Sequence, residues 1–496
     1  MKRHTTARTG LVGTGRRALA LLAGAVIVAA GLVVTTQASP ASAISGDDFL
    51  PGTIISNVVM FNDSTMSAAS IQAFLNAKAG TCASGHTCLK DYHQDTSDYS
   101  VPTTKVGGAF KYTQGVCAKY QGAKNQSAAQ IIYEVAKACG VNPQAIIVTL
   151  QKEQSFVTAT APTSLTYRKA MGYGCPDTAA CNADFYGFFK QVYWGARAMI
   201  RPVSNYKPNV KSAIHFSPKA SCGTKSVLVT NKATSNLYTY TPYVPNRAAL
   251  NNLKGSGDKC SSYGNRNFWR YFTSWFGSTV IPQPDVAFIE AAYQDALGRA
   301  ASSIEQYNQG KYLLKHKSRT DFSAKILHST EHRRVFIAAQ YQAILKRPAT
   351  AAESKALLAK VNSGKVKQGN VPAMLLGSSE YYTTQAGGTP QTFVTAVYEY
   401  ALGRDPSPSA LTTWVARLKK STRAKIAKSI LTSTESDGRL AATMYSTYLA
   451  RPATPAELTT LTKYIAKHGY FAAIAHLMAT TEYFTDATNR FPVLDE

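Results

Sequence analysis

Glu153 is the residue whose surroundings in the sequence most favour chemistry. Between residues 100 and 176 the only acids are Glu134 and Glu153, and of the two only Glu153 follows an apolar run. Burial destabilises an ionised carboxyl, so this group is expected to hold a proton near neutral pH. A general acid that protonates a glycosidic oxygen needs that property. A helix-terminal glutamate paired with Lys152 or Lys169 is the simpler interpretation of the same pattern.

Residues 127–157 predict the two helices that must position Glu153. Ser127 is expected to cap the first helix and Gly140 to end it. Asn142 and Pro143 open the second helix, because proline is favoured at the first helical position. Apolar and small residues dominate this second helix, so we expect it to be buried and to carry Glu153 at its end.

Aromatic residues that follow Glu153 could line a sugar groove. Aromatic rings stack on sugar faces, while the polar tips of Tyr and Trp bond hydroxyl groups. The candidates for substrate binding are Tyr173, Tyr186, Gln191, Tyr193, Trp194, Tyr240 and Tyr243. Most buried aromatics are simply core residues, so we expect about half of this set to contact a substrate. A hydrolase would need a second carboxylate, for which Asp177 and Asp184 are the nearby residues; turn formation is their simpler role.

The first 43 residues predict a secretory signal peptide. Five basic residues and no acid precede an apolar run from Ala18 to Val34, and Ala41-Ser42-Ala43 forms a small-residue cleavage site. A retained membrane anchor is the alternative, because the run is at the lower limit of spanning length. The sequence therefore predicts a secreted or extracellular protein, with cell-wall association as a further option.

The eight cysteines agree with export. All of them lie between Cys82 and Cys260, and an even number confined to one region of an exported chain favours disulfides. Eight cysteines allow 105 pairings, of which we favour pairing between sequence neighbours: Cys82–Cys88, Cys117–Cys139, Cys175–Cys181 and Cys222–Cys260. No C-x-x-C pair is present and the nine His are scattered, so we predict neither a metal nor a cofactor.

Composition divides the chain into two folded regions. The 496 residues are 45% hydrophobic, which excludes a disordered chain, and too many for a single core. The net charge of +26 is spread over both halves. Pro282 and Pro284 indicate a linker. The predicted order is signal peptide 1–43, disulfide-stapled domain 44–278, linker 279–284, helical repeat domain 285–486 and tail 487–496, a mainly α fold throughout.

The second region contains four internal repeats. A Tyr-x-x-x-Leu-x-Arg element places Tyr and Leu on one helix face, and a Ser/Thr-x-Glu element follows 31 to 39 residues after each Tyr. The glycines before two of the arginines are expected to end helices, and the Ser/Thr to cap the next ones. The arginines are Arg299, Arg347, Arg404 and Arg451, which we expect to bond helix-terminal carbonyls; the matching acids are Glu331, Glu380, Glu435 and Glu482.

These repeats resemble a domain of unknown function that is common in exported and surface bacterial proteins, and whose helices are similar to those of phycobilisome linkers. The resemblance extends over residues 285–486. It implies no catalytic residues. Adhesion or attachment to the cell envelope is the function it implies, with a surface protein or wall polymer as the partner; a helical spacer is the alternative.

The segment from Asn142 to Phe156 resembles the catalytic helix of lysozyme-like proteins, especially soluble lytic transglycosylases and goose-type lysozymes. In those proteins a buried helix ends at a catalytic Glu, and a glycine-containing turn follows, which Ala170 to Gly174 resembles here. The stretch 50–278 is also similar to secreted actinobacterial proteins labelled hemagglutinin-like. The sequence departs from the transglycosylase pattern in having Gln154 after the Glu and Tyr173-Gly174-Cys175 in the turn.

Two functions from different classes follow. The first is an exported enzyme that cleaves peptidoglycan glycan strands as a muramidase or lytic transglycosylase, with Glu153 as general acid; the resemblance implies a 1,6-anhydro product. The second is a non-catalytic glycan-binding adhesin attached to the envelope through its repeats. The basic charge would favour an anionic cell wall. Nucleic acid is not expected as a partner, since no recognised motif accompanies the charge.

Overall fold

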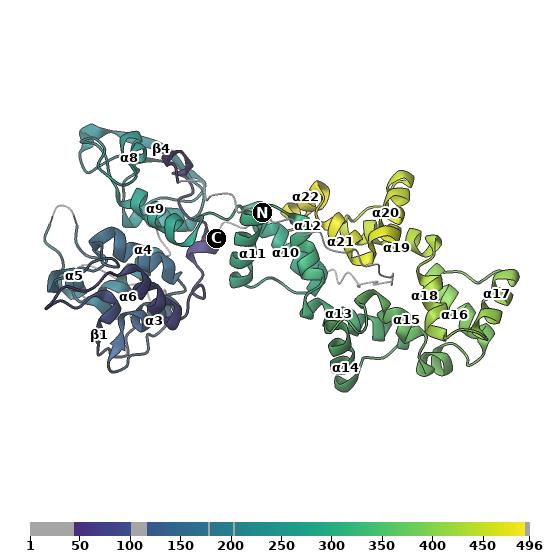
Figure 1. The fold of residues 1–496 in the computed structure, drawn as a ribbon. Coiled ribbons are helices and arrows are strands. Elements are labelled where there is room, and N and C mark those ends of the chain that lie inside the picture. The colour runs from purple at the N-terminus through teal and green to yellow at the C-terminus, as the bar shows by residue number, and fades with distance from the viewer. Residues whose placement is uncertain (1–43, 101–116, 177–178, 202–203, 492–496) are drawn as a thin grey trace, which may run out of the picture. The chain divides into compact units, whose positions relative to one another are not determined.

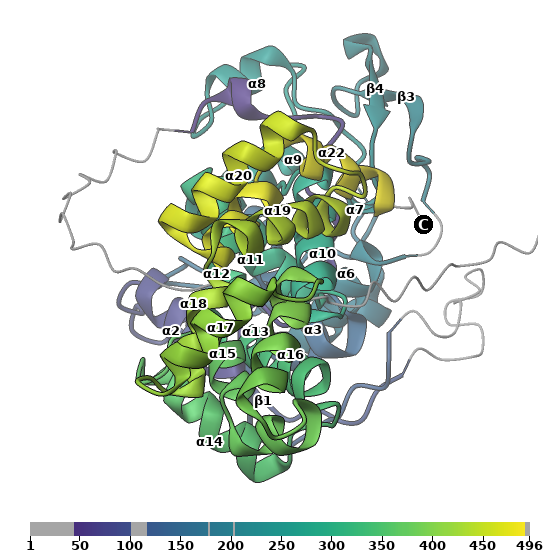
Figure 2. The same cartoon turned by 90° about the vertical axis from the view of Figure 1, so that its right-hand side faces the viewer.

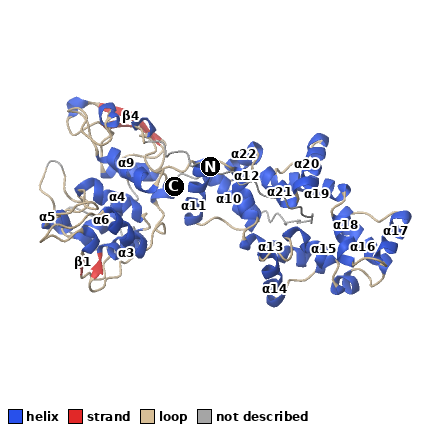
Figure 3. Cartoon of the chain, viewed as in Figure 1, coloured by secondary structure: helices blue, strands red, loops and turns tan. Residues whose placement is uncertain are grey.

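The computed structural model describes residues 44–100, 117–176, 179–201 and 204–491. The predicted signal peptide, residues 1–43, lies outside this range. The fold is mainly α, as predicted, with only short strands among the described residues (Figures 1 and 3). None of the helices in the described ranges is long and apolar enough to span a membrane.

The described chain forms two compact units. The N-terminal unit contains residues 44–289 and 301–316, and the C-terminal unit contains residues 290–300 and 317–491. The segment 301–316 follows the predicted linker in sequence but belongs to the N-terminal unit. Tyr307 from this segment donates a hydrogen bond to Gln144 Oε1 at 2.9 Å, and Asn62 Nδ2 donates to the Ser303 carbonyl at 3.1 Å.

The N-terminal unit is built from short helices, two small antiparallel sheets and four disulfides. Its helices are α1 Asn57–Met60, α2 Ala68–Lys78, α3 Ala128–Cys139, α4 Pro143–Gln154, α5 Ser164–Arg168, α6 Phe188–Met199, α7 Lys232–Tyr240, α8 Arg247–Asn251, α9 Gly264–Phe276 and α11 Ser303–His316. Strand β1 His93–Gln94 pairs with β2 Gln126–Ser127, and β3 Val210–His215 pairs with β4 Thr224–Val229. Val210 lies opposite Val229 in the second pair.

Helix α4 runs through the core of this unit. Every residue from Pro143 to Gln151 is buried, and α3, α6 and α9 pack against it. The capping predictions are confirmed: Ser127 accepts from Gln130 N, Gly140 ends α3 with φ +63°, and Asn142 accepts from Gln144 N. A helix buried over this length positions its C-terminal residues rigidly, since its apolar side chains are packed on all sides.

The cysteine pairing prediction is also confirmed. Cys82–Cys88, Cys117–Cys139, Cys175–Cys181 and Cys222–Cys260 are all disulfide-bonded. The last bridge closes the longest loop, with a sequence separation of 38. It joins the turn before β4 to the segment before α9, so it ties the second sheet to the helical core.

The C-terminal unit is all α. Its elements are the end of α10 Gln283–Leu297, α12 Arg319–Leu327, α13 Thr330–Gln340, a π-helical turn Tyr341–Leu345, α14 Ala351–Asn362, α15 Val371–Leu376, a second π-helical turn Tyr381–Gln385, α16 Pro390–Leu402, α17 Pro408–Leu418, α18 Arg423–Leu431, α19 Thr434–Tyr448, α20 Pro455–His468, α21 Tyr470–Met478 and α22 Thr481–Arg490. Helices α19 and α20 lie side by side (Figures 1 and 2).

The repeat signals identified in the sequence form the helix ends of this unit. Gly298 and Gly403 have φ of +72° and +65° and end their helices in the left-handed conformation. The Ser/Thr of each Ser/Thr-x-Glu element caps the helix or turn that follows, through backbone N–H donors at 3.1 to 3.3 Å. Helices α17, α18 and α19 begin 47 residues before α20, α21 and α22, respectively, so the third and fourth repeats align without a gap.

Candidate functional site around Glu153

Glu153 lies in the last turn of α4. The helix ends at Ser155, which has a left-handed φ of +50°, and Phe156 turns back into the core with its ring fully buried. The Glu153 side chain is 28% exposed. The buried helix therefore delivers a carboxylate to a position that solvent can still reach.

Lys152 is the immediate partner of Glu153. Its side chain is only 3% exposed, and its Nζ lies 2.5 Å from Glu153 Oε1. The same ammonium donates to Thr241 Oγ1 at 3.0 Å and lies 5.1 Å from the centre of the Tyr240 ring. A buried ammonium needs such partners because an uncompensated charge in the interior is costly. The pairing with Lys152 considered from the sequence is thus present.

Gly172 lies against the other carboxylate oxygen. A Cβ added at this residue would lie 3.3 Å from Glu153 Oε2, and the backbone has a φ of +68°. Both the conformation and the close approach favour glycine here. The absence of a side chain leaves Oε2 uncovered on this side, whereas Oε1 faces Lys152.

Tyr240 joins α7 to the same turn. Its hydroxyl donates to the Met171 carbonyl. Burial, and next the neighbouring Glu153 carboxylate, raise the pKa of Tyr240 well above its usual value. Arg201 is also half-buried here, and burial lowers its pKa while the nearby Tyr173 opposes that change. Tyr240 therefore stays a neutral hydroxyl beside the carboxylate.

Gln191 holds the turn from inside the protein. It is fully buried, and its Oε1 accepts hydrogen bonds from the backbone N–H groups of Met171 and Tyr173, both at 3.1 Å. Its Nε2 donates to the Tyr173 and Phe185 carbonyls at 2.9 and 2.8 Å. The structure therefore gives Gln191 a place in positioning the Gly172 turn, since every polar position of its amide contacts backbone.

The remaining predicted residues lie in several environments. Tyr193 and Trp194 are buried among other aromatics, and Trp194 Nε1 donates to Tyr99 Oη at 3.0 Å. Tyr186 is half-buried and donates to the Cys181 carbonyl at 3.3 Å. Tyr243 follows α7, half-buried, where its backbone bridges to His215. Of the two acids considered, Asp184 is exposed and Asp177 lies outside the described residues.

This arrangement brings together a carboxylate, an ammonium and a neutral phenol. Glu153 and Lys152 touch directly, and the Tyr240 ring contacts Lys152. A single carboxylate can transfer a proton in both directions during one reaction cycle, and its neighbouring ammonium stabilises the ionised stage. The chemistry that this group offers is therefore proton transfer at one oxygen, Oε2.

One grouping with metal-compatible spacing is found among the described residues. It consists of Cys82, Cys88 and Asp91. The two cysteines form a disulfide, and a thiolate is what binds a metal, so this grouping lacks the ligands that the spacing suggests.

A second cluster of charged side chains recurs four times in the C-terminal unit. Each repeat arginine forms a two-pronged ion pair with the glutamate 31 to 33 residues later, at 2.5 to 2.8 Å. The pairs are Arg299–Glu331, Arg347–Glu380, Arg404–Glu435 and Arg451–Glu482. Each arginine also donates to the next residue's carbonyl at 3.0 or 3.1 Å and lies over the Tyr of its own repeat. We call this arrangement the arginine clamp.

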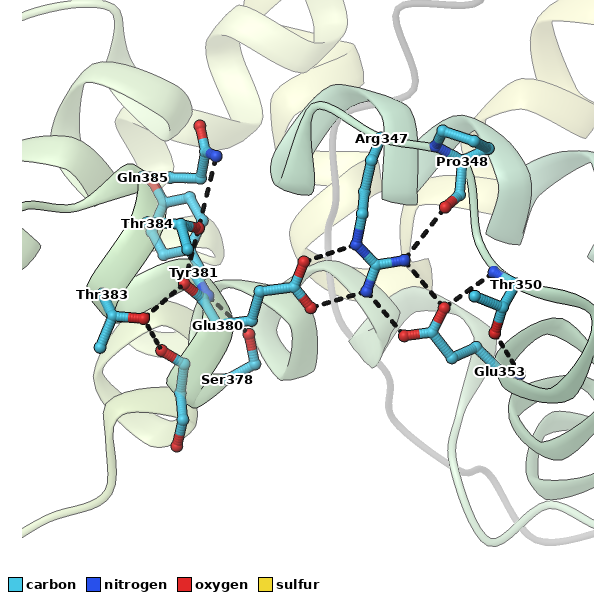
Figure 4. Close-up of polar contacts among 11 residues, drawn as sticks. Arg347, Pro348, Thr350, Glu353, Ser378, Glu380, Tyr381, Thr383, Thr384 and Gln385 are labelled. Atoms are coloured by element: carbon cyan, nitrogen blue, oxygen red, sulfur yellow. Dashed lines mark hydrogen bonds and ion pairs between the residues drawn. The ribbon is translucent and has the colours of Figure 1, made fainter.

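The clamp of the second repeat has an additional acid. Glu353 binds Arg347 at 2.9 and 2.7 Å on the side opposite Glu380 (Figure 4). Hydrogen bonds from Arg347 lower the pKa of Glu353 to about 2. Glu457 repeats this contact on Arg451, and its pKa also falls to about 2. The equivalent position in the third repeat is Ala410, so Arg404 lacks this second carboxylate.

The prediction that the arginines bond helix-terminal carbonyls was incomplete. One N–H of each does so, but the two-pronged partner is a glutamate from a separate helix start. The sequence contained the signal, because each arginine is followed by a Ser/Thr-x-Glu element at nearly constant spacing. At the Glu153 site, the sequence gave no signal for Thr241 and Arg201, which are distant in the chain.

Comparison with known families identifies part of the C-terminal unit. Residues 372–440 match a domain of unknown function, DUF4214. The matched segment begins in α15 and includes the complete Arg404–Glu435 clamp. No curated protein and no solved structure matches the chain.

Proposed function

We propose that the N-terminal unit cleaves glycan strands of peptidoglycan, with Glu153 as the acid and base. The observation that supports this most is the asymmetry of its carboxylate. Oε1 is paired with Lys152, while Oε2 lies beside a glycine and belongs to a side chain that is 28% exposed. A glycosidic oxygen placed at Oε2 could take a proton from it.

In this proposal one carboxyl group serves both steps. Protonated Glu153 gives its proton to the glycosidic oxygen, and the C1–O bond breaks with its electron pair leaving on that oxygen. The ionised carboxylate then takes the proton from the 6-hydroxyl of the same sugar as that oxygen attacks C1. A 1,6-anhydro sugar forms, and Glu153 is protonated again. The balance needs neither water nor a second carboxylate.

Lys152 and Tyr240 would support the ionised stage. The Lys152 ammonium lies 2.5 Å from Oε1 and so stabilises the negative charge left on the carboxylate after proton transfer. Tyr240 fixes the Gly172 turn through the Met171 carbonyl. Gln191 holds the same turn from the core, so the position of the turn relative to Oε2 is set from two sides.

The test is turnover of purified peptidoglycan by wild type and Glu153→Gln, with Glu134→Gln on α3 as the matched control. General acid catalysis contributes roughly 10²- to 10⁴-fold, so Glu153→Gln should lose at least that much while Glu134→Gln keeps full activity. Mass spectrometry of the products should show anhydro ends. Equal activity of the two variants would remove Glu153 from the mechanism.

Loss of folding must be separated from loss of chemistry. Glu153→Gln leaves the buried Lys152 ammonium without its counter-charge, which is expected to cost about 1–3 kcal/mol of stability. The double variant Lys152→Met/Glu153→Gln removes both charges and should recover part of that stability. It should remain inactive, because the proton donor is still missing. Recovery of activity in the double variant would contradict the proposal.

Glycan binding without turnover is the second candidate, and the Lys152–Glu153 ion pair favours it. A carboxylate neutralised by a buried ammonium is a stable structural pair as well as a reactive one. In that case wild type and Glu153→Gln would both retain peptidoglycan in a pull-down, and neither would release soluble fragments.

A further inference from the structure

The largest concave surface described in the C-terminal unit is a groove between α17 and α18. Its volume is about 940 Å³. Four cations line it and no acid does: Arg417, Lys420, Lys425 and Lys428. Helices α16, α17 and α18 pack together around this region (Figure 1). The groove lies entirely within one unit and shares no residue with the Glu153 site.

The sequence around the groove is unusually basic. From residue 406 to residue 434 there are six Lys or Arg and no Asp or Glu. Arg423 is used inside the protein, where it donates to the Gly377 carbonyl and Ser379 Oγ at 3.3 and 3.2 Å. In the described chain, none of the four lining cations has an ion pair, and all four are exposed. Their mutual repulsion is therefore uncompensated by neighbouring acids.

The fourth repeat shows that the fold does not require these charges. It aligns with the third without a gap, and there the lining cations are replaced by Tyr464, Ala472 and Ala475, with only Lys467 retained. The helices nevertheless begin at the same positions. The cations are thus an addition to one repeat rather than part of the repeat structure.

One wall of the groove is aromatic. Trp414 is the single Trp of the C-terminal unit and lines the groove beside the cations. Its Nε1 donates to Tyr398 Oη at 2.8 Å, which fixes the ring, and the Arg417 guanidinium lies 4.7 Å from the ring centre. The corresponding residue in the fourth repeat is Leu461, which is buried. A fixed indole beside cations suits a ligand with both anionic groups and carbon-rich faces.

We propose that the α17–α18 groove binds an anionic cell-envelope polymer whose units are linked by phosphodiesters. Lysine ammonium groups bind phosphate as point charges, and three of the four lining cations are lysines. An open groove that contains several cations fits a chain with repeated charges better than a single small anion. The proposal does not depend on the activity of Glu153.

Two observations favour such a polymer over nucleic acid. The same chain contains four disulfides, which persist in oxidising compartments outside the cytosol. Proteins that bind single-stranded nucleic acid generally present several aromatic side chains for base stacking, and this groove has only Trp414.

The experiment uses the full chain and poly(glycerol phosphate) as the probe, with affinity measured over a range of salt concentrations. The groove variant is Lys425→Ala/Lys428→Ala, which introduces the residues that the fourth repeat has at these positions. The matched control is Lys463→Ala/Lys467→Ala, which removes two exposed lysines from the fourth repeat. Both variants lose the same net charge, so overall electrostatic attraction changes equally.

The groove variant should bind about tenfold more weakly at low salt, and its salt dependence should flatten by about one per lost phosphate contact. The control should keep both the affinity and the slope of the wild type. Circular dichroism should show equal helix content in all three. Equal losses in the two variants would mean diffuse attraction to a basic surface and would overturn the site.

Trp414 supplies a second readout of where the polymer binds. The change in tryptophan emission on adding poly(glycerol phosphate) should be absent in Trp414→Leu, and its persistence would place binding elsewhere. Polygalacturonate and single-stranded DNA of equal charge serve as competitors. Stronger competition by polygalacturonate would overturn the phosphodiester assignment, and stronger competition by DNA would overturn the choice of an envelope polymer.

Discussion

Four disulfides link segments of the N-terminal unit, whereas the C-terminal unit contains no cysteine and repeats one arginine clamp four times. The disulfides join sequence neighbours in loops. The clamps join the end of one helix to the start of another 31 to 33 residues later. Covalent bridges resist acid and salt but not reductants, and ion pairs have the opposite sensitivities. The same chain therefore has two units that should fail under different conditions.

Loss of the Cys222–Cys260 bridge should have the largest effect. Chain-entropy arguments give about 4 kcal/mol for a loop of this length. In Cys222→Ala/Cys260→Ala, hydrogen exchange measured peptide by peptide in the full chain should accelerate in β3, β4 and α9. Peptides from α12 to α22 should be unchanged. Acceleration across both units would mean that they are not independent.

Acid should weaken the C-terminal unit through His332. Burial, and next the charge of His328, lower the pKa of His332 to about 4. The unfolded chain therefore binds the proton first, so stability is complete above pH 6.5 and is lost as the pH falls toward 4. The loss should reach about 3 kcal/mol. Denaturant melts followed by hydrogen exchange between pH 7 and 4 measure it, and His332→Gln should flatten this part of the profile.

Gly172→Ala should separate backbone strain from contact with Glu153. A left-handed φ costs a residue with a Cβ about 1–2 kcal/mol. Gly140, with φ +63° and open space around its Cβ position, gives the matched control in the same unit. Both variants should lose similar stability in a thermal melt. Only Gly172→Ala should also lose peptidoglycan turnover, because its methyl group would cover Oε2; equal turnover by both would argue against a reaction at that oxygen.

The clamps should differ among repeats by the smallest amount. Arg347→Gln leaves Glu353 and Glu380 facing each other without their shared cation, whereas Arg404→Gln leaves only Glu435. These side chains are about one-third to one-half exposed, so each effect is modest. The melting temperature should fall more for Arg347→Gln, and the difference should shrink in high salt. A larger fall for Arg404→Gln would contradict the role of the second acid.

Local sequence signals predicted the helix ends, the repeats and the disulfide partners. Ser127, Asn142 and Gly140 act within a few residues of their own positions, so their roles follow from neighbouring backbone groups. The cysteine pairs join sequence neighbours for the same reason, since short loops close at the least entropic cost. The position of Glu153 at the end of a buried helix also followed from local pattern.

Contacts between distant segments were decided only by the tertiary structure. Gly172 approaches Glu153, Thr241 bonds Lys152, and Gln191 holds the Gly172 turn, yet no periodicity links these residues in the chain. The clamps fall between the two cases, because their spacing was visible in the sequence while the identity of the partner was not. Local hydrogen bonding and short loops are encoded by neighbouring residue types. Which side chains meet across a core depends on how whole helices pack, and that is set by many residues together.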